Sequence, residues 1–119
     1  MFGKIFSDIT TITTEEVIIT DERIEHCNKH QNAYEKYGRY ISIVLSDPDF
    51  IFLDSHPKTA VLIRRIQMDD TNLQIVLRLH VLTDAPGYQN SIISFWNIGQ
   101  KRKENYRKNK IIIYKRGDL

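Results

Sequence analysis

The sequence predicts an α+β domain with N-terminal helices packed on a four- to five-stranded, largely antiparallel sheet. Capping residues begin a helix near residue 21 and apolar side chains recur at helical spacing over residues 34–45, whereas residues 50–96 are short apolar and β-branched runs separated by turn signals. The chain has 119 residues, of which 41% are hydrophobic and 27% charged. This is an ordinary globular composition, and the length favours one domain spanning residues 1–119.

Two helices are expected near the N-terminus, after a short strand around Val17–Ile19. Thr20 and Asp21 are N-cap residue types and Glu22 follows in the first turn, which predicts a helix from about 21 to 30. A second helix is predicted from about 32 to 46, where apolar side chains repeat with helical spacing. The polar segment Ser46–Asp49, which contains a proline, should end it.

The rest of the chain favours strands. Turn signals at 56–58, 69–72 and 84–87 separate β-branched runs, and one polar segment, Gly99–Asn109, is typical of a helix. The predicted strands are Phe50–Leu53, Thr59–Gln67, Leu73–Leu82, Ser91–Trp96 and Ile111–Tyr114.

The strand predicted at 73–82 has an apolar face and a face with polar and charged side chains. Alternation places one apolar set on the core face: Ile75, Leu77, Leu79 and Val81. The opposite face then carries Gln74, Val76, Arg78 and His80. An antiparallel sheet commonly leaves one face to solvent, so Arg78 and His80 are either solvated side chains or the floor of a cationic cleft.

Charge is divided unevenly along the chain. Residues 85–119 hold eight Lys and Arg against two acidic residues, whereas the first 84 hold nine basic and thirteen acidic residues. One strongly cationic end is the electrostatic pattern of a protein that binds a polyanion, although a solvated lysine-rich helix would have the same composition.

Several classes of protein are disfavoured. No apolar run is long enough to span a membrane, and the N-terminal MFGKIF lacks the long apolar stretch of a signal peptide. Cys27 is the single cysteine, so there is no internal disulfide, and it is expected to be a small buried residue. The composition suits a reducing bacterial cytoplasm, and a toxin domain cut from a larger secreted or phage protein would look the same.

The order of several short motifs resembles the phage-associated nuclease domains grouped with barnase, EndoU, the colicin tRNases and RelE, in particular their second phage subgroup. The resemblance covers roughly residues 14–116. Its motifs are Arg23–His26 with His30, Tyr34–Tyr37, Asp47–Ile51, Pro57–Ala60, Ile75–Leu79, Gly87–Trp96, Lys101–Arg102, Tyr106, Asn109–Lys110 and Ile113–Lys115. Ser94 stands where Thr is as common, and the segment around Arg102–Lys103 lacks an expected aromatic residue.

The resemblance implies N-terminal helices on an antiparallel sheet and metal-independent cleavage of RNA, often tRNA, by toxins of phages, mobile elements and contact-dependent competition systems. It also implies a cognate immunity or antitoxin protein as partner and no cofactor. The positions that carry over are His30, Lys58, Arg78, Ser91, Ser94 and Tyr106.

These residue types suit RNA cleavage, in which a base takes the ribose 2′ proton and a cation stabilises the phosphorane. His30 is the preferred titrating group and His80 the second candidate; a cation at a helix end is the structural alternative for His30. Arg78 is the residue expected to stabilise the transition state, because a guanidinium binds phosphate oxygens. A zinc site at His26 and His30 is disfavoured, because HCNKH lacks the glutamate of HExxH and a third ligand.

Other residues have weaker assignments. Ser91 and Ser94 lie on opposite faces of a regular strand, so at most one would face the cleft unless a bulge intervenes. Tyr106 either stacks on a base or anchors its helix to the sheet, with Trp96 or Tyr114 beneath it. The expected RNA-docking cations are Lys58, Lys101, Lys103, Arg107, Lys108 and Lys110.

Two alternatives to a nuclease remain open from the sequence. A non-catalytic nucleic-acid-binding module would use the same basic helix without a titrating group. A partner-binding domain of a phage or mobile element would turn its basic end toward an acidic protein, and an immunity protein would look much the same.

Overall fold

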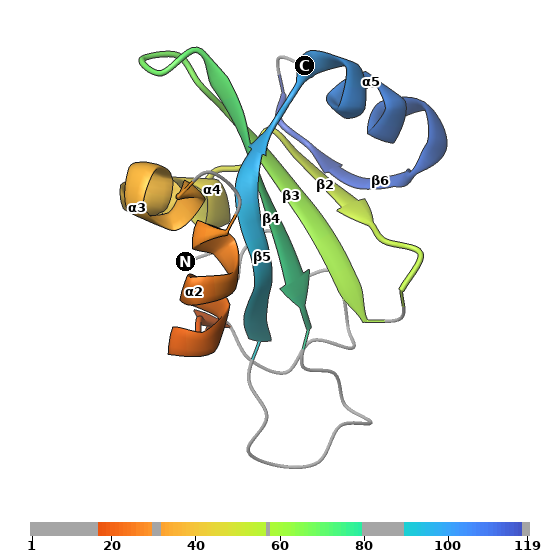
Figure 1. The fold of residues 1–119 in the computed structure, drawn as a ribbon. Helices are drawn as coiled ribbons and strands as arrows, with labels where there is room; N and C mark the ends of the chain where they lie inside the picture. The colour runs from red at the N-terminus through yellow and green to blue at the C-terminus, as the bar shows by residue number, and fades with distance from the viewer. Residues whose placement is uncertain (1–16, 30–31, 57, 80–89, 118–119) are drawn as a thin grey trace.

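The computed structural model describes residues 17–29, 32–56, 58–79 and 90–117. In chain order the elements are β1 (Val17–Ile18), α2 (Asp21–Asn28), α3 (Ala33–Tyr37), a 3₁₀ turn (Gly38–Tyr40), α4 (Ile41–Ser46), β2 (Phe50–Leu53), β3 (Thr59–Ile66), β4 (Thr71–Arg78), β5 (Asn90–Ile98), α5 (Gln100–Asn109) and β6 (Ile111–Lys115). The α+β class is confirmed, and α5 precedes the last strand as expected (Figure 1).

The sheet has six strands in the order β1-β5-β4-β3-β2-β6. The prediction of four to five antiparallel strands is therefore wrong in number and in type, because β1 runs parallel to β5. No hairpin joins β1 to β5, so nothing in the connection forces the antiparallel orientation. The remaining neighbouring pairs are antiparallel.

The predicted N-terminal helices form with one interruption. Thr20 caps α2, and its Oγ1 accepts a hydrogen bond from the backbone N–H of Arg23 at 3.2 Å. The helix expected over 32–46 is instead α3, a 3₁₀ turn and α4. The turn begins at Gly38, a residue type that disfavours a continuous helix.

Both faces of the sheet bury apolar side chains, because α2, α3 and α4 pack on one face and α5 on part of the other (Figure 1). Ile75, Leu77 and Leu79 lie in the main core, as their alternation predicted. The opposite face is less exposed than expected: Gln74 is only 3% exposed, beside a second cluster that includes Phe50 and Ile63. This second face carries the candidate site.

An ion-pair network fixes the end of β6 to the rest of the sheet. Asp49 is 4% exposed, and its Oδ2 accepts a hydrogen bond from the backbone N–H of Arg65 at 2.8 Å. Its Oδ1 lies 3.7 Å from Arg64 Nη1 and 3.5 Å from Arg116 Nη1. Arg64 and Arg116 also pair with Asp47. The two aspartates before β2, Asp47 and Asp49, therefore link β3 to the residue that follows β6 through ion pairs.

A second ion pair holds the junction between α5 and β6. The ammonium of Lys110 lies 2.7 Å from Asp54 Oδ1, just after β2. Burial alone would raise the pKa of Asp54, but the hydrogen bonds from Lys110, the backbone of Ser55 and His56, together with the Lys110 charge, lower it.

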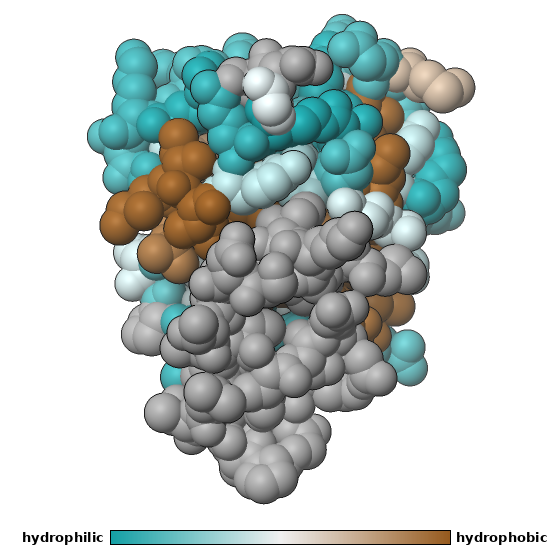
Figure 2. All heavy atoms as spheres, turned by 180° about the vertical axis from the view of Figure 1, so that it is seen from behind, coloured by the Kyte–Doolittle hydropathy of each residue, from teal (hydrophilic) through white to brown (hydrophobic). Residues whose placement is uncertain are grey.

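Exposed apolar side chains gather at the β6 edge, where Figure 2 shows a hydrophobic patch on the side of the molecule. Ile111 is 66% exposed, Ile112 42% and Leu53 41%. Lys110 and Lys115 flank these isoleucines, as charges often do at strand edges. Among the described helices, none is long and apolar enough to cross a membrane.

Candidate active site

Arg78 lies in the middle of a polar row that crosses three strands. The register pairs it with Thr59 on β3 and with Ser91 on β5. Residues directly opposite each other in a sheet project from the same face, so these three side chains share one side. Thr59 is 5% exposed, and Arg78 and Ser91 are half-buried.

A β-bulge brings Ser94 to the same face. Val76 pairs with Ser94 and Leu77 with Ile92, so Ile93 is an extra residue in β5. In a regular strand Ser91 and Ser94 would point in opposite directions, so the sequence alone allowed at most one of them to face the cleft. The bulge shifts the alternation by one residue, and both hydroxyls therefore join Arg78, with Ser94 5% exposed.

The guanidinium of Arg78 is held close to its own backbone, because Nη1 donates a hydrogen bond to the carbonyl oxygen of Leu79. A guanidinium has five donors in a planar fork, a geometry that suits phosphate oxygens. Lys58, which precedes Thr59 in the chain, is exposed and has φ 58°. Its carbonyl oxygen accepts a hydrogen bond from Leu79 N–H at 2.7 Å.

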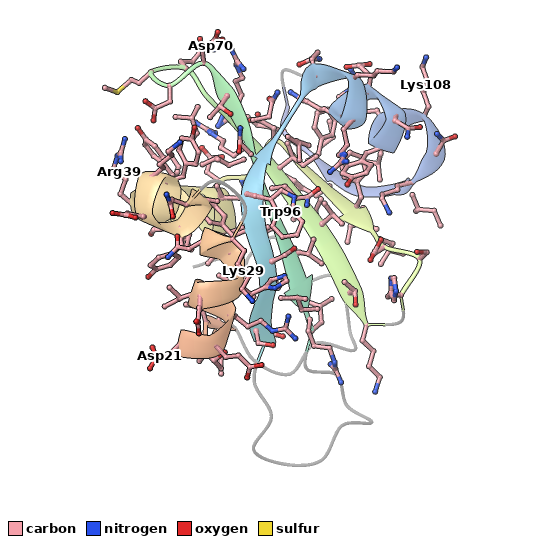
Figure 3. All side chains as sticks on the ribbon, in the orientation of Figure 1. Asp21, Lys29, Arg39, Asp70, Trp96 and Lys108 are labelled. Atoms are coloured by element: carbon pink, nitrogen blue, oxygen red, sulfur yellow. The ribbon has the colours of Figure 1, made fainter. Side chains whose placement is uncertain are left out.

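Trp96 continues this face two residues beyond Ser94. Figure 3 shows it on β5, near the strand edge that α2 approaches. The imidazole of His26, on α2, lies with its ring centroid 6.2 Å from that of Trp96, and the two planes are tilted by 55°. Both residues are half-buried. The sequence offered no signal for this pair, since the two residues are seventy positions apart.

The histidines fall into two groups. His30 and His80, the predicted titrating groups, lie outside the described residues. His56 is 81% exposed and contacts Asp54, its Nδ1 lying 3.3 Å from Oδ2 beyond the end of β2. His26 is the histidine that the described part of the structure places on the margin of the Arg78 face.

Tyr106 lies over the same side of the sheet as Arg78, but away from it. Its ring packs edge-on against Phe52 with centroids 6.1 Å apart, and the Lys110 ammonium lies 5.2 Å from the Tyr106 ring. Phe52 stands in the same row as Ser94 but three strands away, about 14 Å at ordinary strand spacing. Of the two roles open to Tyr106, this position favours the anchor, with Phe52 beneath it.

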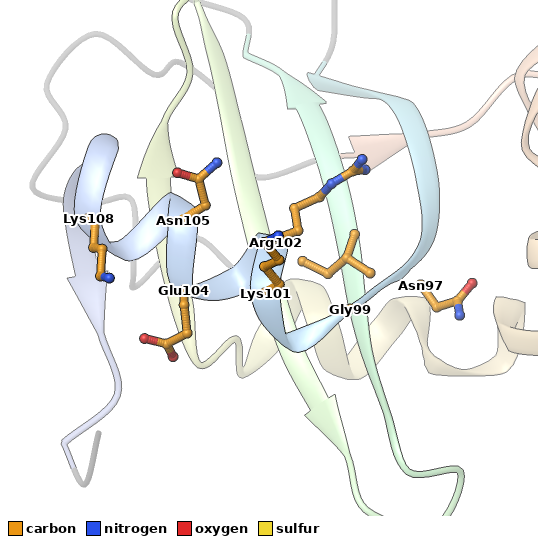
Figure 4. Close-up of a pocket in the computed structure, with 8 residues that line it drawn as sticks. Asn97, Gly99, Lys101, Arg102, Glu104, Asn105 and Lys108 are labelled. Carbon is orange, nitrogen blue, oxygen red and sulfur yellow. The ribbon is translucent and has the colours of Figure 1, made fainter.

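The cations of α5 and the turn after it divide into two sets. The inner cations are those whose charged groups lie over the sheet: Lys103 is 5.9 Å and Arg107 5.2 Å from the Phe50 ring, and Lys110 pairs with Asp54. The outer cations, Lys101, Arg102 and Lys108, are exposed. They line a groove of about 1070 Å³ with Asn97, Ile98, Gly99, Glu104 and Asn105 (Figure 4).

The site holds no ready-made metal centre in the described ranges, where no group of three or more His, Cys, Asp or Glu side chains could bind an ion. Cys27 is fully buried, as expected. Burial raises the pKa of its thiol, although a hydrogen bond with the Phe95 backbone and the charge of Arg23 act against this. Cys27 is thus a core residue rather than a nucleophile.

The Arg78 face therefore combines a guanidinium, three hydroxyl groups and an aromatic pair. The groove of the outer cations lies farther along the sheet, because its residue Ile98 pairs with Asn72, which is about 20 Å from Arg78 along β4 at the usual strand rise. Hydroxyl and guanidinium donors can bind the oxygens of a phosphodiester and stabilise extra negative charge there. Of these residues, Arg78, Ser91 and Ser94 were predicted; Thr59, Trp96 and His26 were not assigned to the site from the sequence.

Comparison with known proteins agrees with this chemistry. No curated protein and no solved structure matches the chain significantly. A family model, described as phage-Barnase-EndoU-ColicinE5/D-RelE like nuclease2, matches residues 1–115. The match covers every element of the fold, including all of the strands that build the Arg78 face. The chain thus belongs to this phage-associated nuclease family, and the resemblance seen in the sequence is confirmed.

Proposed function

We propose that this domain is a metal-independent endoribonuclease that cleaves RNA by attack of the ribose 2′-hydroxyl on the adjacent phosphorus. The observation that carries the proposal is the convergence of Arg78 with Thr59, Ser91 and Ser94 on one face of the sheet. Membership of a nuclease family supports phosphodiester cleavage in general. The choice of RNA rests on the resemblance described in the sequence, because phosphate-binding donors suit RNA and DNA alike.

In this reaction the 2′-oxygen forms a bond to phosphorus while the bond to the 5′-oxygen breaks, which leaves a 2′,3′-cyclic phosphate. A base accepts the 2′ proton and an acid returns a proton to the leaving 5′-oxygen. The substrate supplies its own nucleophile, so the protein needs no reactive serine. Arg78 neutralises the phosphorane, and the Ser91 and Ser94 hydroxyls donate to its oxygens.

The base is an imidazole in this proposal, because histidine titrates near neutral pH. His30 and His80 keep the roles predicted for them, and substitution of each in turn identifies the base. The outer cations bind the RNA backbone and orient it without choosing a sequence. tRNA is the proposed substrate and a bacterial toxin the proposed biological role, with an immunity or antitoxin protein as partner.

Purified protein incubated with total bacterial RNA in EDTA tests the proposal. The expected products carry 2′,3′-cyclic phosphate ends, and Arg78→Ala should lose most of the cleavage while still folding. Lys36→Ala, on the opposite side of the molecule, is the control and should cleave normally. A strict need for added Mg²⁺ or Zn²⁺, or equal cleavage by Arg78→Ala, would refute the mechanism.

The toxin role has a separate test in cells. Induced expression in a bacterium should stop growth, and Arg78→Ala should restore it at equal protein level. Fragment ends mapped in total RNA should concentrate in tRNA. Folded wild-type protein that leaves growth and RNA intact would instead support a partner-binding domain.

A further inference from the structure

We propose that Trp96 and His26 form a subsite for an RNA base next to the scissile phosphate, with Trp96 as the stacking platform. The inference rests on the proposed function for its ligand. It assigns to this aromatic pair a role that the catalytic scheme leaves open.

The position of Trp96 is the first argument. Trp96 and Ser94 are two residues apart on β5 and project from the same face, about 7 Å apart at the usual strand rise. A phosphate bound by Ser94 and Arg78 therefore places a neighbouring base within reach of the indole. Phe95, between them, is fully buried in the main core, so the strand is fixed while Trp96 remains half-exposed.

The edge of the sheet provides the second argument. β1 pairs with only Asn90 and Ser91 of β5, so no described strand lies beyond β5 at Trp96. Helix α2 approaches there instead, and His26 meets the indole at a tilt of 55° rather than stacking flat on it. His26 thus supports the indole, which remains partly exposed. Base stacking on such an aromatic ring is tolerant of sequence.

Gln74 provides the third argument. The register places it directly across from Trp96 on the same face. Its side chain is buried, yet its Oε1 accepts no hydrogen bond from any described residue. Buried acceptors are normally satisfied, and the amino group of a base held beside Trp96 is a donor of the kind that this oxygen lacks.

Trp96 is the single tryptophan of the sequence, so its fluorescence reports on this site alone. The probe is a 2′-O-methyl oligonucleotide, which lacks the nucleophile and cannot be cleaved. A matched oligonucleotide with abasic residues keeps the backbone charge but removes the bases. The intact probe should quench Trp96 fluorescence on binding, and the abasic probe should bind at low salt with little quenching.

Two substitutions separate stacking from packing. Trp96→Phe retains a flat ring and should bind the intact probe within about threefold of the wild type, whereas Trp96→Leu should bind it roughly tenfold more weakly. Neither should change affinity for the abasic probe. Circular dichroism checks the fold, and the wild-type fluorescence experiment still decides the question if the leucine variant does not fold.

The outcomes also separate this inference from the proposed function. Equal quenching by both probes, or binding without quenching, overturns the base subsite even if the protein cleaves RNA. Base-dependent quenching by a protein that does not cleave RNA supports the subsite and overturns the nuclease proposal.

Discussion

The outer cations should account for a defined part of the salt dependence of RNA binding. Lys101 and Lys108 are exposed in the groove beside α5, and each exposed cation that contacts a phosphate releases counterions on binding. The variant Lys101→Gln/Lys108→Gln removes two such contacts and retains Arg102, so that binding remains measurable.

The size of the effect follows from the number of contacts. For single-stranded RNA each phosphate contact contributes about 0.7 to the slope of log affinity against log salt, so two contacts contribute about 1.4. Over a roughly fourfold increase in salt, the wild type should therefore lose about sevenfold more affinity than the variant.

Fluorescence anisotropy of a labelled 2′-O-methyl oligonucleotide measures this slope without cleavage. The control variant, Lys36→Gln/Arg39→Gln, removes the same charge from exposed positions in α3 and the turn after it, which pack on the other face. The control should change the slope by less than about 0.5. An unchanged slope in the α5 variant, or an equal change in the control, would refute the assignment of the groove to RNA.

Three further predictions follow from the site and its supports. Arg78→Ala should lower the cleavage rate about 10²–10³-fold, with partial recovery in Arg78→Lys, whereas full recovery of the wild-type rate in Arg78→Lys would contradict bidentate phosphate binding. Asp49→Asn should lower the free energy of unfolding by about 3 kcal/mol in urea titrations, because it leaves two arginines without their buried partner. A loss near zero would contradict a stabilising role for this ion-pair network. Asp54→Asn should cost about 1 kcal/mol at neutral pH. Since the folded pKa of Asp54 is lowered, the contribution is complete above the unfolded value near 4 and disappears as pH falls through the folded pKa, so the wild-type and variant stabilities should converge in acid.

Much of the strand pattern could be predicted from the sequence. β2 has the expected bounds, and β3, β5 and β6 differ from the predicted strands by one or two residues, because β-branched and apolar runs between polar turns are strong local signals. The buried side of β4 also followed from alternation. These features depend on residues close together in the chain.

The errors lie where distant parts of the chain meet. Gln74 was assigned to an exposed face, but it is 3% exposed, in a row that continues through Ile63 to Phe50. The parallel pairing of β1 with β5 depends on how the intervening helices and strands pack, and no local sequence pattern encodes that packing. Helix 32–46 breaks near Gly38, and periodicity alone did not reveal that break.

The candidate site was predicted in part for the same reason. Arg78 followed from alternation along one strand. The joint orientation of Ser91 and Ser94 depends on the bulge at Ile93, which is a property of the pairing between β4 and β5 rather than of either strand. The contact between His26 and Trp96 requires the packed fold.

The most direct test of the Arg78 face as a ribonuclease site is the cleavage rate of one RNA oligonucleotide in EDTA, measured with a ribose and then with a single deoxyribose at the mapped cleavage position. The wild type should cut the first substrate to a cyclic phosphate and leave the second intact at that position. Cleavage of both substrates at similar rates would show that the 2′-hydroxyl is not the nucleophile and would contradict the mechanism.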